Sequence, residues 1–141
     1  MTDSGNRVRH LSKVLICIGS NWGDRFATVR DAITILSGTT AGIRSSSIYE
    51  TPAAGNLPDS PPYMNAVVEA KVECSCEELQ RKLKQMEINA GRNAECRRLG
   101  RVPLDMDIVE FENKILRPED FMQSYYRMGR EELEKFHDNN Q

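Results

Sequence analysis

The sequence predicts an α+β fold, βαββαβ in order, with a mostly antiparallel sheet and two helices on one face. Four segments have strand-like apolar patterns, at residues 13–18, 43–51, 63–72 and 102–111. Two others, 26–36 and 75–90, repeat apolar residues at helical spacing instead. Glycine, proline or charged residues separate all six segments, so each boundary is marked by the residue types that end regular structure.

The first strand and helix follow a polar start, residues 1–12, which we expect to be loose. Residues 13–18 form a short, almost wholly apolar run that is typical of a buried strand. The turn at 19–24 leads to a helix. Its expected buried face is Phe26, Val29, Ile33 and Leu36. The glycines and threonines of 38–42 should end this helix.

The next two strands flank a proline-rich loop. Residues 43–51 are rich in β-branched and hydroxyl side chains, which predicts a strand. Residues 52–62 hold four of the six prolines and are therefore a loop. Residues 63–72 resume the strand pattern, with small and β-branched apolar residues on alternate positions from Ala66 to Val72.

The second helix should begin at the capping box Ser75-x-x-Glu78 and end near Gly91. Its expected apolar face is Leu79, Leu83, Met86 and Ala90. Residues 92–101 are charged and predict a mobile loop, before the strand at 102–111 and a turn at 112–114. The tail from 119 should be partly helical, notably 130–136, and frayed at 138–141. The order of elements is the ferredoxin-like arrangement.

Length and composition exclude several classes of protein. A chain of 141 residues with 39% hydrophobic residues fits one domain, 1–141, with a single core. The early apolar run of five residues is too short to span a membrane or to form a signal peptide, so we expect a cytoplasmic protein. A net charge of -2 disfavours a nucleic-acid binder. The four cysteines lack zinc-ligand spacing and are expected to be free thiols.

Leu104-Asp105-Met106-Asp107-Ile108 is the sharpest local signal for chemistry. Side chains alternate along a strand, so Asp105 and Asp107 should share one face, with Cα atoms about 6.5–7 Å apart. Two such carboxylates repel each other, and a divalent cation between them relieves this. Magnesium suits ligation by carboxylates together with substrate phosphates. The alternative is a solvated strand face whose two aspartates pair with nearby arginines.

Three further segments could take part in a site. The arginines of 92–101 could bind phosphates, or could form a solvated charged loop. Gly19 lets another group approach the backbone closely, although the segment also reads as an ordinary turn, and neither glycine-rich phosphate-binding motif is present. An aromatic ring and an amide, Tyr63 and Asn65, could enclose a flat heterocycle, or could be strand-end packing.

Taken in order, these segments resemble the 6-hydroxymethyl-7,8-dihydropterin pyrophosphokinase family of folate synthesis. The similarity runs roughly from residue 14 to 111. Its elements are Ile18-Gly19-Ser20-Asn21, Tyr49-Glu50-Thr51-Pro52, Tyr63-Met64-Asn65, Glu87, Gly91-Arg92, Arg98 and Leu104-Asp105-Met106-Asp107-Ile108. Each is weak alone, but the Thr-Pro and Leu-Asp-x-Asp-Ile elements together are specific.

The resemblance implies transfer of pyrophosphate from ATP to the hydroxymethyl group of a reduced pterin, giving AMP. It implies that Asp105 and Asp107 hold two magnesium ions. The residues implied for the pterin pocket are Gly19, Thr51, Pro52, Tyr63 and Asn65. Those implied for ATP are Glu87, Arg92, Arg98 and Ile108, with Arg92 and Arg98 on a loop that closes over the phosphates. The expected partners are therefore these two small molecules.

The arginine segment departs from the family pattern. Ala94, Leu99 and Val102 stand where the family has arginine, tryptophan and arginine, and Arg101 is the candidate to replace the displaced charge. The family also has a histidine beyond the last matched strand, where this chain reads Ser-Tyr-Tyr. An alternative function is therefore a weakly active or non-catalytic pterin- or nucleotide-binding paralogue.

Overall fold

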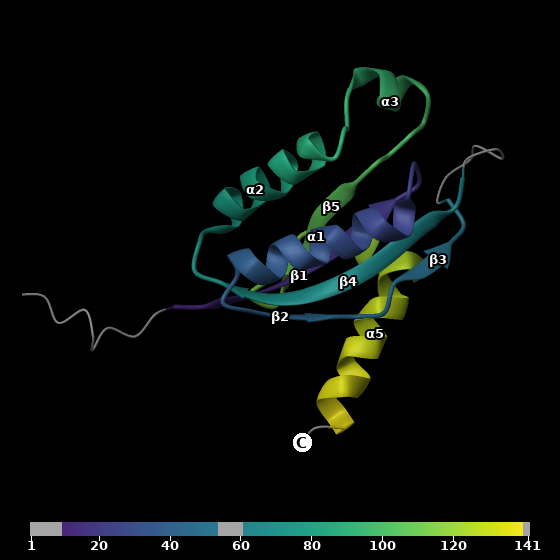
Figure 1. Cartoon of the computed structure of the whole chain (residues 1–141). Helices are drawn as coiled ribbons and strands as arrows, with labels where there is room; N and C mark the ends of the chain where they lie inside the picture. The colour runs from purple at the N-terminus through teal and green to yellow at the C-terminus, as the bar shows by residue number, and fades with distance from the viewer. Residues whose placement is uncertain (1–9, 54–60, 140–141) are drawn as a thin grey trace, which may run out of the picture.

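The computed structural model describes residues 10–53 and 61–139, with side chains to residue 135 (Figure 1). The strands in this part of the chain are β1 Ser12–Ser20, β2 Gly42–Ser45, β3 Tyr49–Thr51, β4 Tyr63–Val72, β5 Asp105–Phe111 and β6 Lys114–Ile115. The helices are α1 Arg25–Thr39, α2 Cys76–Asn89, α3 Ala94–Arg98, α4 Pro118–Phe121 and α5 Ser124–Asn139. None of these helices is long and apolar enough to cross a membrane.

The strands form one sheet in the order β2-β4-β1-β5-β6, with β3 also pairing with β4, and every pairing is antiparallel. This confirms the predicted ferredoxin-like βαββαβ arrangement. The central strand β1 sets the geometry of the candidate site. Gly19 pairs with Asn65 on one side and Asp105 on the other, and Cys17 pairs with Asp107. The turn after β1 thus lies beside the acidic end of β5.

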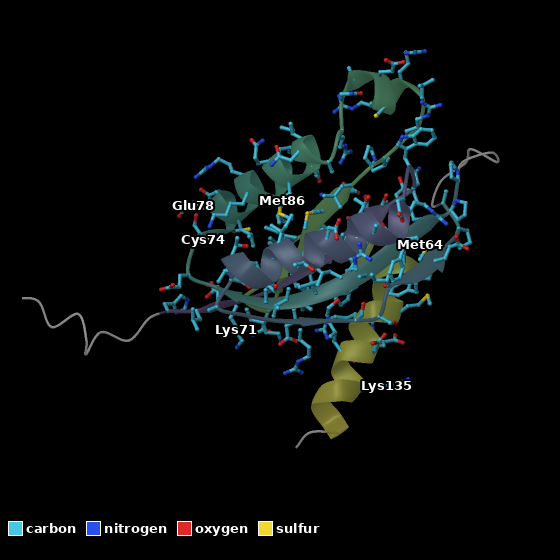
Figure 2. All side chains as sticks on the ribbon, in the orientation of Figure 1. Met64, Lys71, Cys74, Glu78, Met86 and Lys135 are labelled. Atoms are coloured by element: carbon cyan, nitrogen blue, oxygen red, sulfur yellow. The ribbon has the colours of Figure 1, made fainter. Side chains whose placement is uncertain are left out.

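One face of the sheet is covered by α1 and α2, as predicted (Figure 1). Val14, Ile16 and Ile18 of β1 point into this core, where Leu36 of α1 and Leu83 of α2 meet them. Met86, labelled in Figure 2, packs at its margin. Both helices begin at side-chain caps. Asp24 accepts from the Ala27 backbone N–H, and Ser75 with Glu78 forms the predicted capping box. Phe26, which the helical spacing placed inside, is exposed.

The opposite face is covered by α5, a layer that the sequence analysis did not predict. Leu15 and Cys17 of β1 point to this side, alternating with the residues of the first core. Tyr126 and Leu133 of α5 cover them and are buried. The sheet is therefore apolar on both faces. Figure 1 shows α5 crossing the strands on the side away from α1.

Several boundaries differ from the predicted ones. The strand expected at 43–51 is two strands, because Ser46 turns its hydroxyl to the Val67 backbone N–H and interrupts the ladder. The charged loop contains the short helix α3, capped by Asn93. The strand expected from Val102 starts at Asp105, because the backbone of Val102 pairs with Asn21 instead. The helix α1 runs through Gly38 to Thr39.

The two ends of the chain also differ from expectation. β1 begins at Ser12, inside the stretch expected to be loose, and residues 1–9 lie outside the described part. The tail helix is longer than 130–136, since α5 spans Ser124–Asn139 and follows the short α4. The predicted fraying at 138–141 falls partly on residues 140–141, which also lie outside the described part of the chain.

A glycine allows α5 to lie very close to the sheet. An added Cβ at Gly129 would be 2.6 Å from Val67 Cγ2 and 2.8 Å from the Tyr49 hydroxyl oxygen, closer than such atoms can approach. The Gly129 backbone N–H donates to that hydroxyl at 3.0 Å, and the hydroxyl donates to the Tyr125 carbonyl oxygen at 2.5 Å. Tyr49 of β3 therefore ties the first turns of α5 to the sheet.

A buried ionic network holds the middle of α5. Glu110 of β5 accepts hydrogen bonds from the Tyr126 hydroxyl at 2.5 Å and from Arg130 Nε at 2.8 Å. Burial opposes ionisation of Glu110, but the bonds from Arg130 and Tyr126 outweigh it and lower its pKa. The carboxylate is thus more acidic in the folded protein than in the unfolded chain.

We expect Glu110→Gln to lower the free energy of unfolding by about 2 kcal/mol at pH 7, because the bonds to a charged acceptor weaken. Since the folded pKa is depressed, this contribution is full above the ordinary value of 4.5 and is lost as the pH falls through the folded pKa. Urea denaturation at pH 7 and pH 3 measures it. The control Glu134→Gln removes the exposed partner of Arg130 and should change little. A constant deficit at both pH values would contradict this assignment.

Candidate functional site

The acidic pair lies on the α5 face of β5, at the end of the strand next to Gly19. Met106 and Ile108 point into the core beneath α2, so Asp105 and Asp107 point together to the other side, as the alternation predicted. Their side chains are 38% and 29% exposed. Burial, and then the neighbouring Asp105 carboxylate, raises the pKa of Asp107 to about 7. The site thus concentrates negative charge that its surroundings only partly neutralise.

A first cavity, of about 200 Å³, opens on this face of the sheet. We call it the pocket. Its lining residues are Cys17, Gly19, Thr51, Pro52, Tyr63, Asp105, Asp107, Arg117, Asp120 and Tyr125. The strands β1 and β5 form its floor, β3 and the start of β4 form one wall, and α4 with α5 forms the other. Four of the five residues that the resemblance implies for a pterin pocket line it, and the fifth, Asn65, does not.

A second cavity, of about 580 Å³, lies between α2 and β5, and we call it the groove. Its lining residues are Gln80, Leu83, Lys84, Glu87, Arg92, Asp105, Met106, Asp107, Ile108, Leu116 and Arg117. Three of the residues expected near ATP, Glu87, Arg92 and Ile108, are among them. Among the residues that the structure describes, the pocket and the groove share Asp105, Asp107 and Arg117. The acidic pair is therefore at the junction of two separate cavities.

Arg92 spans the space between α2 and the acidic pair. Its Nη1 lies 3.0 Å from Asp105 Oδ1 and 3.1 Å from Glu87 Oε1. Glu87 is buried, and its other carboxylate oxygen accepts the Met106 backbone N–H at 2.8 Å. Burial raises the pKa of Glu87, against the opposing effects of Met106 and Arg92. Glu87 thus fixes both the start of β5 and the guanidinium of Arg92.

Arg98 and Arg101, both expected to contact phosphate, are not brought to the acidic pair. Arg98 is exposed on α3 and pairs with Glu95 at 3.6 Å. The Arg101 guanidinium carbon lies 3.9 Å from the centre of the Trp22 ring. The described lining of the pocket and of the groove contains neither arginine. The conformation described here therefore leaves Arg92 and Arg117 as the arginines at the pair.

The segment that carries these arginines is anchored by Asn21. The buried Asn21 side chain accepts the Val102 backbone N–H at 2.5 Å and donates to the Gly100 carbonyl oxygen at 3.1 Å. Gly91 and Gly100, on either side of α3, have φ angles of 103° and 70° that favour glycine. The described side chains of α3 include no buried residue. The segment is thus fixed at its two ends and exposed between them.

Asn65 lies behind the pocket wall and is buried. Its Nδ2 donates to the Thr51 hydroxyl oxygen at 2.6 Å and to the Tyr63 carbonyl oxygen at 3.4 Å. An added Cβ at Gly19 would be 3.1 Å from Asn65 Oδ1 and 3.3 Å from the Tyr63 ring. The absence of a side chain at Gly19 thus makes room for the amide and the ring. In this conformation Asn65 joins two wall residues of the pocket.

Sequence reasoning missed Arg117, Asp120 and Tyr125, which form the far wall of the pocket. They follow the last strand, in a stretch with no clear apolar period. One signal could have located them. The run Val14 to Ile18 is apolar at every position, and a strand of that kind is covered on both faces. A second helical layer, and hence residues of the tail near the acidic pair, could have been inferred from it.

The donor set at the junction fits a magnesium ion that is also held by phosphates. Asp105 and Asp107 place two carboxylates on one face of the strand, and the side chain of each is partly exposed. Within the described residues, no group of three or more histidine, cysteine, aspartate or glutamate side chains could hold a metal ion. Magnesium is commonly bound by one or two carboxylates with substrate phosphates and water completing the shell.

Comparison with known proteins agrees with this geometry. Residues 15–133 match the family model of 7,8-dihydro-6-hydroxymethylpterin-pyrophosphokinase. The chain belongs to this family. It is 34% identical over 115 residues to the 2-amino-4-hydroxy-6-hydroxymethyldihydropteridine pyrophosphokinase of Bacillus subtilis, covering 80% of this chain and 68% of that protein. The protein of the same name from Haemophilus influenzae is 31% identical over 120 residues, covering 84% and 74%.

Plant relatives of the pyrophosphokinase family are much longer. The mitochondrial folate synthesis bifunctional protein of Pisum sativum is 35% identical over 98 residues, which cover 69% of this chain and 19% of that protein. The chain thus spans about a fifth of this plant relative. The pyrophosphokinase match includes the acidic pair and both cavities, and it extends into α5.

Proposed function

We propose that this protein transfers the pyrophosphoryl group of ATP to the hydroxymethyl group of 6-hydroxymethyl-7,8-dihydropterin and releases AMP. The observation that carries this proposal is the junction of two cavities at Asp105 and Asp107. A transfer between two substrates needs both reacting atoms at one place, and the junction supplies it. Family membership supports the same reaction. We further propose that the whole chain, 1–141, acts as one domain.

The pocket suits the pterin. Its two tyrosines, Tyr63 and Tyr125, come from opposite walls, and Thr51 and Pro52 line the same wall as Tyr63. A flat heterocycle of this kind is bound by aromatic surfaces and by a few fixed polar groups. Burial, followed by the charge of Asp105, raises the pKa of Tyr63, so its hydroxyl stays a hydrogen-bond donor. The hydroxymethyl group would then point toward the acidic pair on the pocket floor.

The groove suits the nucleotide. Leu116 offers an exposed apolar surface to the adenine beside the buried Leu83 and Ile108, and Arg92 and Arg117 stand where the phosphates would approach the pair. In the reaction, the hydroxymethyl oxygen bonds to the β-phosphorus, the bond from that phosphorus to the α–β bridging oxygen breaks, and AMP leaves. The hydroxyl proton is lost to solvent. Asp105 and Asp107 would hold two magnesium ions, which neutralise phosphate charge when bound.

The experiment that tests this function is AMP release from ATP, measured with and without the pterin and with and without magnesium. We expect release that requires both. The alternative is a binding protein of the same family with little turnover, which the positions of Arg98 and Arg101 away from the pair favour. Tight binding of both ligands without AMP release would establish that alternative. Absence of pterin binding would contradict the transfer reaction, and absence of binding of both ligands would contradict the alternative as well.

Asn65 should matter for the pterin alone. Asn65→Ala removes the amide that joins Thr51 to Tyr63, so two residues of one pocket wall lose a fixed partner. We expect weaker pterin binding by about 1–3 kcal/mol and unchanged binding of magnesium–ATP. Titration calorimetry with each ligand measures both. The control Asn89→Ala removes an exposed amide of α2 that bonds Gln85. Equal losses for the two ligands would show a general structural role instead.

A further inference from the structure

Arg117 is, besides the acidic pair, the one residue that the described linings of both cavities share. It follows β6 and precedes α4 in the chain. Its Nη1 lies 3.9 Å from Asp107 Oδ1, whereas Arg92 Nη1 lies 3.0 Å from Asp105 Oδ1. The pair is thus flanked by two guanidinium groups, one for each carboxylate. The longer contact leaves the Nη groups of Arg117 able to donate to another anion.

The orientation of Arg117 is imposed by its neighbours. Its Nε donates to Asp120 Oδ2, and the other oxygen of that carboxylate accepts the Tyr125 hydroxyl. The Asp120 side chain is only 17% exposed, whereas the Arg117 side chain is 50% exposed, so the largely buried carboxylate orients a guanidinium that stays open to solvent. With its Nε turned to Asp120, the guanidinium presents its Nη groups toward Asp107 and the junction.

Tyr125 is in turn fixed to the sheet. Its carbonyl oxygen accepts the Tyr49 hydroxyl at 2.5 Å, and α5 is held close by Gly129 and by the bond from Arg130 to Glu110. Burial, and then the bond to Asp120, raises the pKa of Tyr125 and keeps its hydroxyl protonated. A continuous set of contacts therefore runs from β3 through Tyr125 and Asp120 to the guanidinium of Arg117.

We propose that Arg117 binds the phosphates at the junction, and that Asp120 and Tyr125 are positioning residues that hold its guanidinium there. The proposal deepens the proposed function and rests on it for the identity of the anion. A guanidinium keeps its charge at every working pH and donates to two phosphate oxygens at once. Arg117 would supply, from the α4 side, positive charge that Arg98 and Arg101 do not bring to the pair in this conformation.

The test measures two quantities on the full chain, namely the affinity for magnesium–ATP and the rate of AMP release. The variants are Arg117→Ala, Asp120→Asn, Tyr125→Phe and the double variant of Arg117→Ala with Asp120→Asn. We expect Arg117→Ala to weaken magnesium–ATP binding by about tenfold or more, since hydrogen bonds to charged groups are strong. Asp120→Asn and Tyr125→Phe should each have a smaller effect in the same direction. Arg117→Lys should restore part of the loss.

The double variant separates positioning from simple stability. If Asp120 acts through Arg117, then Asp120→Asn changes little once Arg117 is alanine, and the two effects are not additive. Additive effects would overturn the positioning role. Arg30→Ala, which removes an exposed arginine paired with Asp31 on α1, is the matched control and should change neither quantity. Circular dichroism on every variant identifies any loss of fold, and Tyr125→Phe, which removes one oxygen atom, keeps the positioning testable if Asp120→Asn unfolds.

The outcomes distinguish this inference from the proposed function. Unchanged magnesium–ATP affinity and unchanged turnover in Arg117→Ala would overturn the inference while leaving an active parent enzyme unaffected. A parent that binds magnesium–ATP without pterin-dependent AMP release would contradict the proposed function. In that case weaker nucleotide binding by Arg117→Ala would still support Arg117 as the phosphate contact, and equal binding would reject it.

Discussion

Replacing Asp105 and Asp107 together by alanine is expected to abolish magnesium-dependent nucleotide binding while the protein stays folded. The two carboxylates are the proposed oxygen ligands at the junction of pocket and groove, and neither contributes to the apolar cores. Without them, the site would lack the carboxylates that are proposed to hold a divalent cation beside the phosphates. The rate of AMP release should fall by at least about a thousandfold, which corresponds to roughly 4 kcal/mol in the barrier.

The double variant should also be no less stable than the parent above pH 7. The folded protein raises the pKa of Asp107 from 3.8 to about 7, so the ionised carboxylate is disfavoured by folding. A group of this kind loses its stabilising effect as the pH rises from its unfolded to its folded pKa, and removing it at pH 8 relieves repulsion. Calorimetric titration with magnesium–ATP and thermal unfolding at pH 8 test the two statements. Parent-like nucleotide affinity would reject the pair as metal ligands.

Arg92→Ala is expected to lower the rate of AMP release by about a hundredfold, or roughly 2.7 kcal/mol. Arg92 lies on the groove side of the pair, where its positive charge can stabilise the negative charge that develops on the phosphates in the transition state. Its removal should therefore lower turnover more than affinity. Its removal also leaves the buried Glu87 without its 3.1 Å partner. A decrease in thermal stability should accompany the kinetic loss.

Single-turnover kinetics, together with equilibrium binding of each substrate, separates these effects of Arg92→Ala. Arg81→Ala is a suitable control, because Arg81 is exposed on the same helix as Glu87 and lines neither cavity. An unchanged chemical step in Arg92→Ala would remove the main electrostatic contribution from the proposed mechanism. A loss confined to ATP affinity would assign Arg92 to ground-state binding alone.

The sequence was informative where local rules decide the structure. The alternation from Leu104 to Ile108 predicted which side chains share a face. Side chains alternate in this way along any strand, whichever strands it pairs with. The capping box at Ser75 predicted the start of α2 for a similar reason, since it involves only four consecutive residues. The order of strands and helices then restricted the topology to one common arrangement.

The sequence was less informative where distant residues compete. The direction of Arg101 depends on Trp22, which lies 79 positions earlier, and a cation over an aromatic ring leaves no pattern along the chain. The start of β5 depends in the same way on Asn21, which takes the backbone of Val102 out of the strand. The far wall of the pocket depends on the packing of α5 against one face of β1, which is a contact between residues distant in the sequence.

Gly129 links the distance between α5 and the sheet to the width of the pocket. Because α5 approaches Val67 more closely than any side chain would allow, the helix that carries Tyr125 sits at its minimum distance from the sheet. A methyl group at position 129 would therefore act as a spacer, displacing one wall of the pocket without touching any residue that lines it. The size of the pocket is thus set in part by a residue that is not among its described lining.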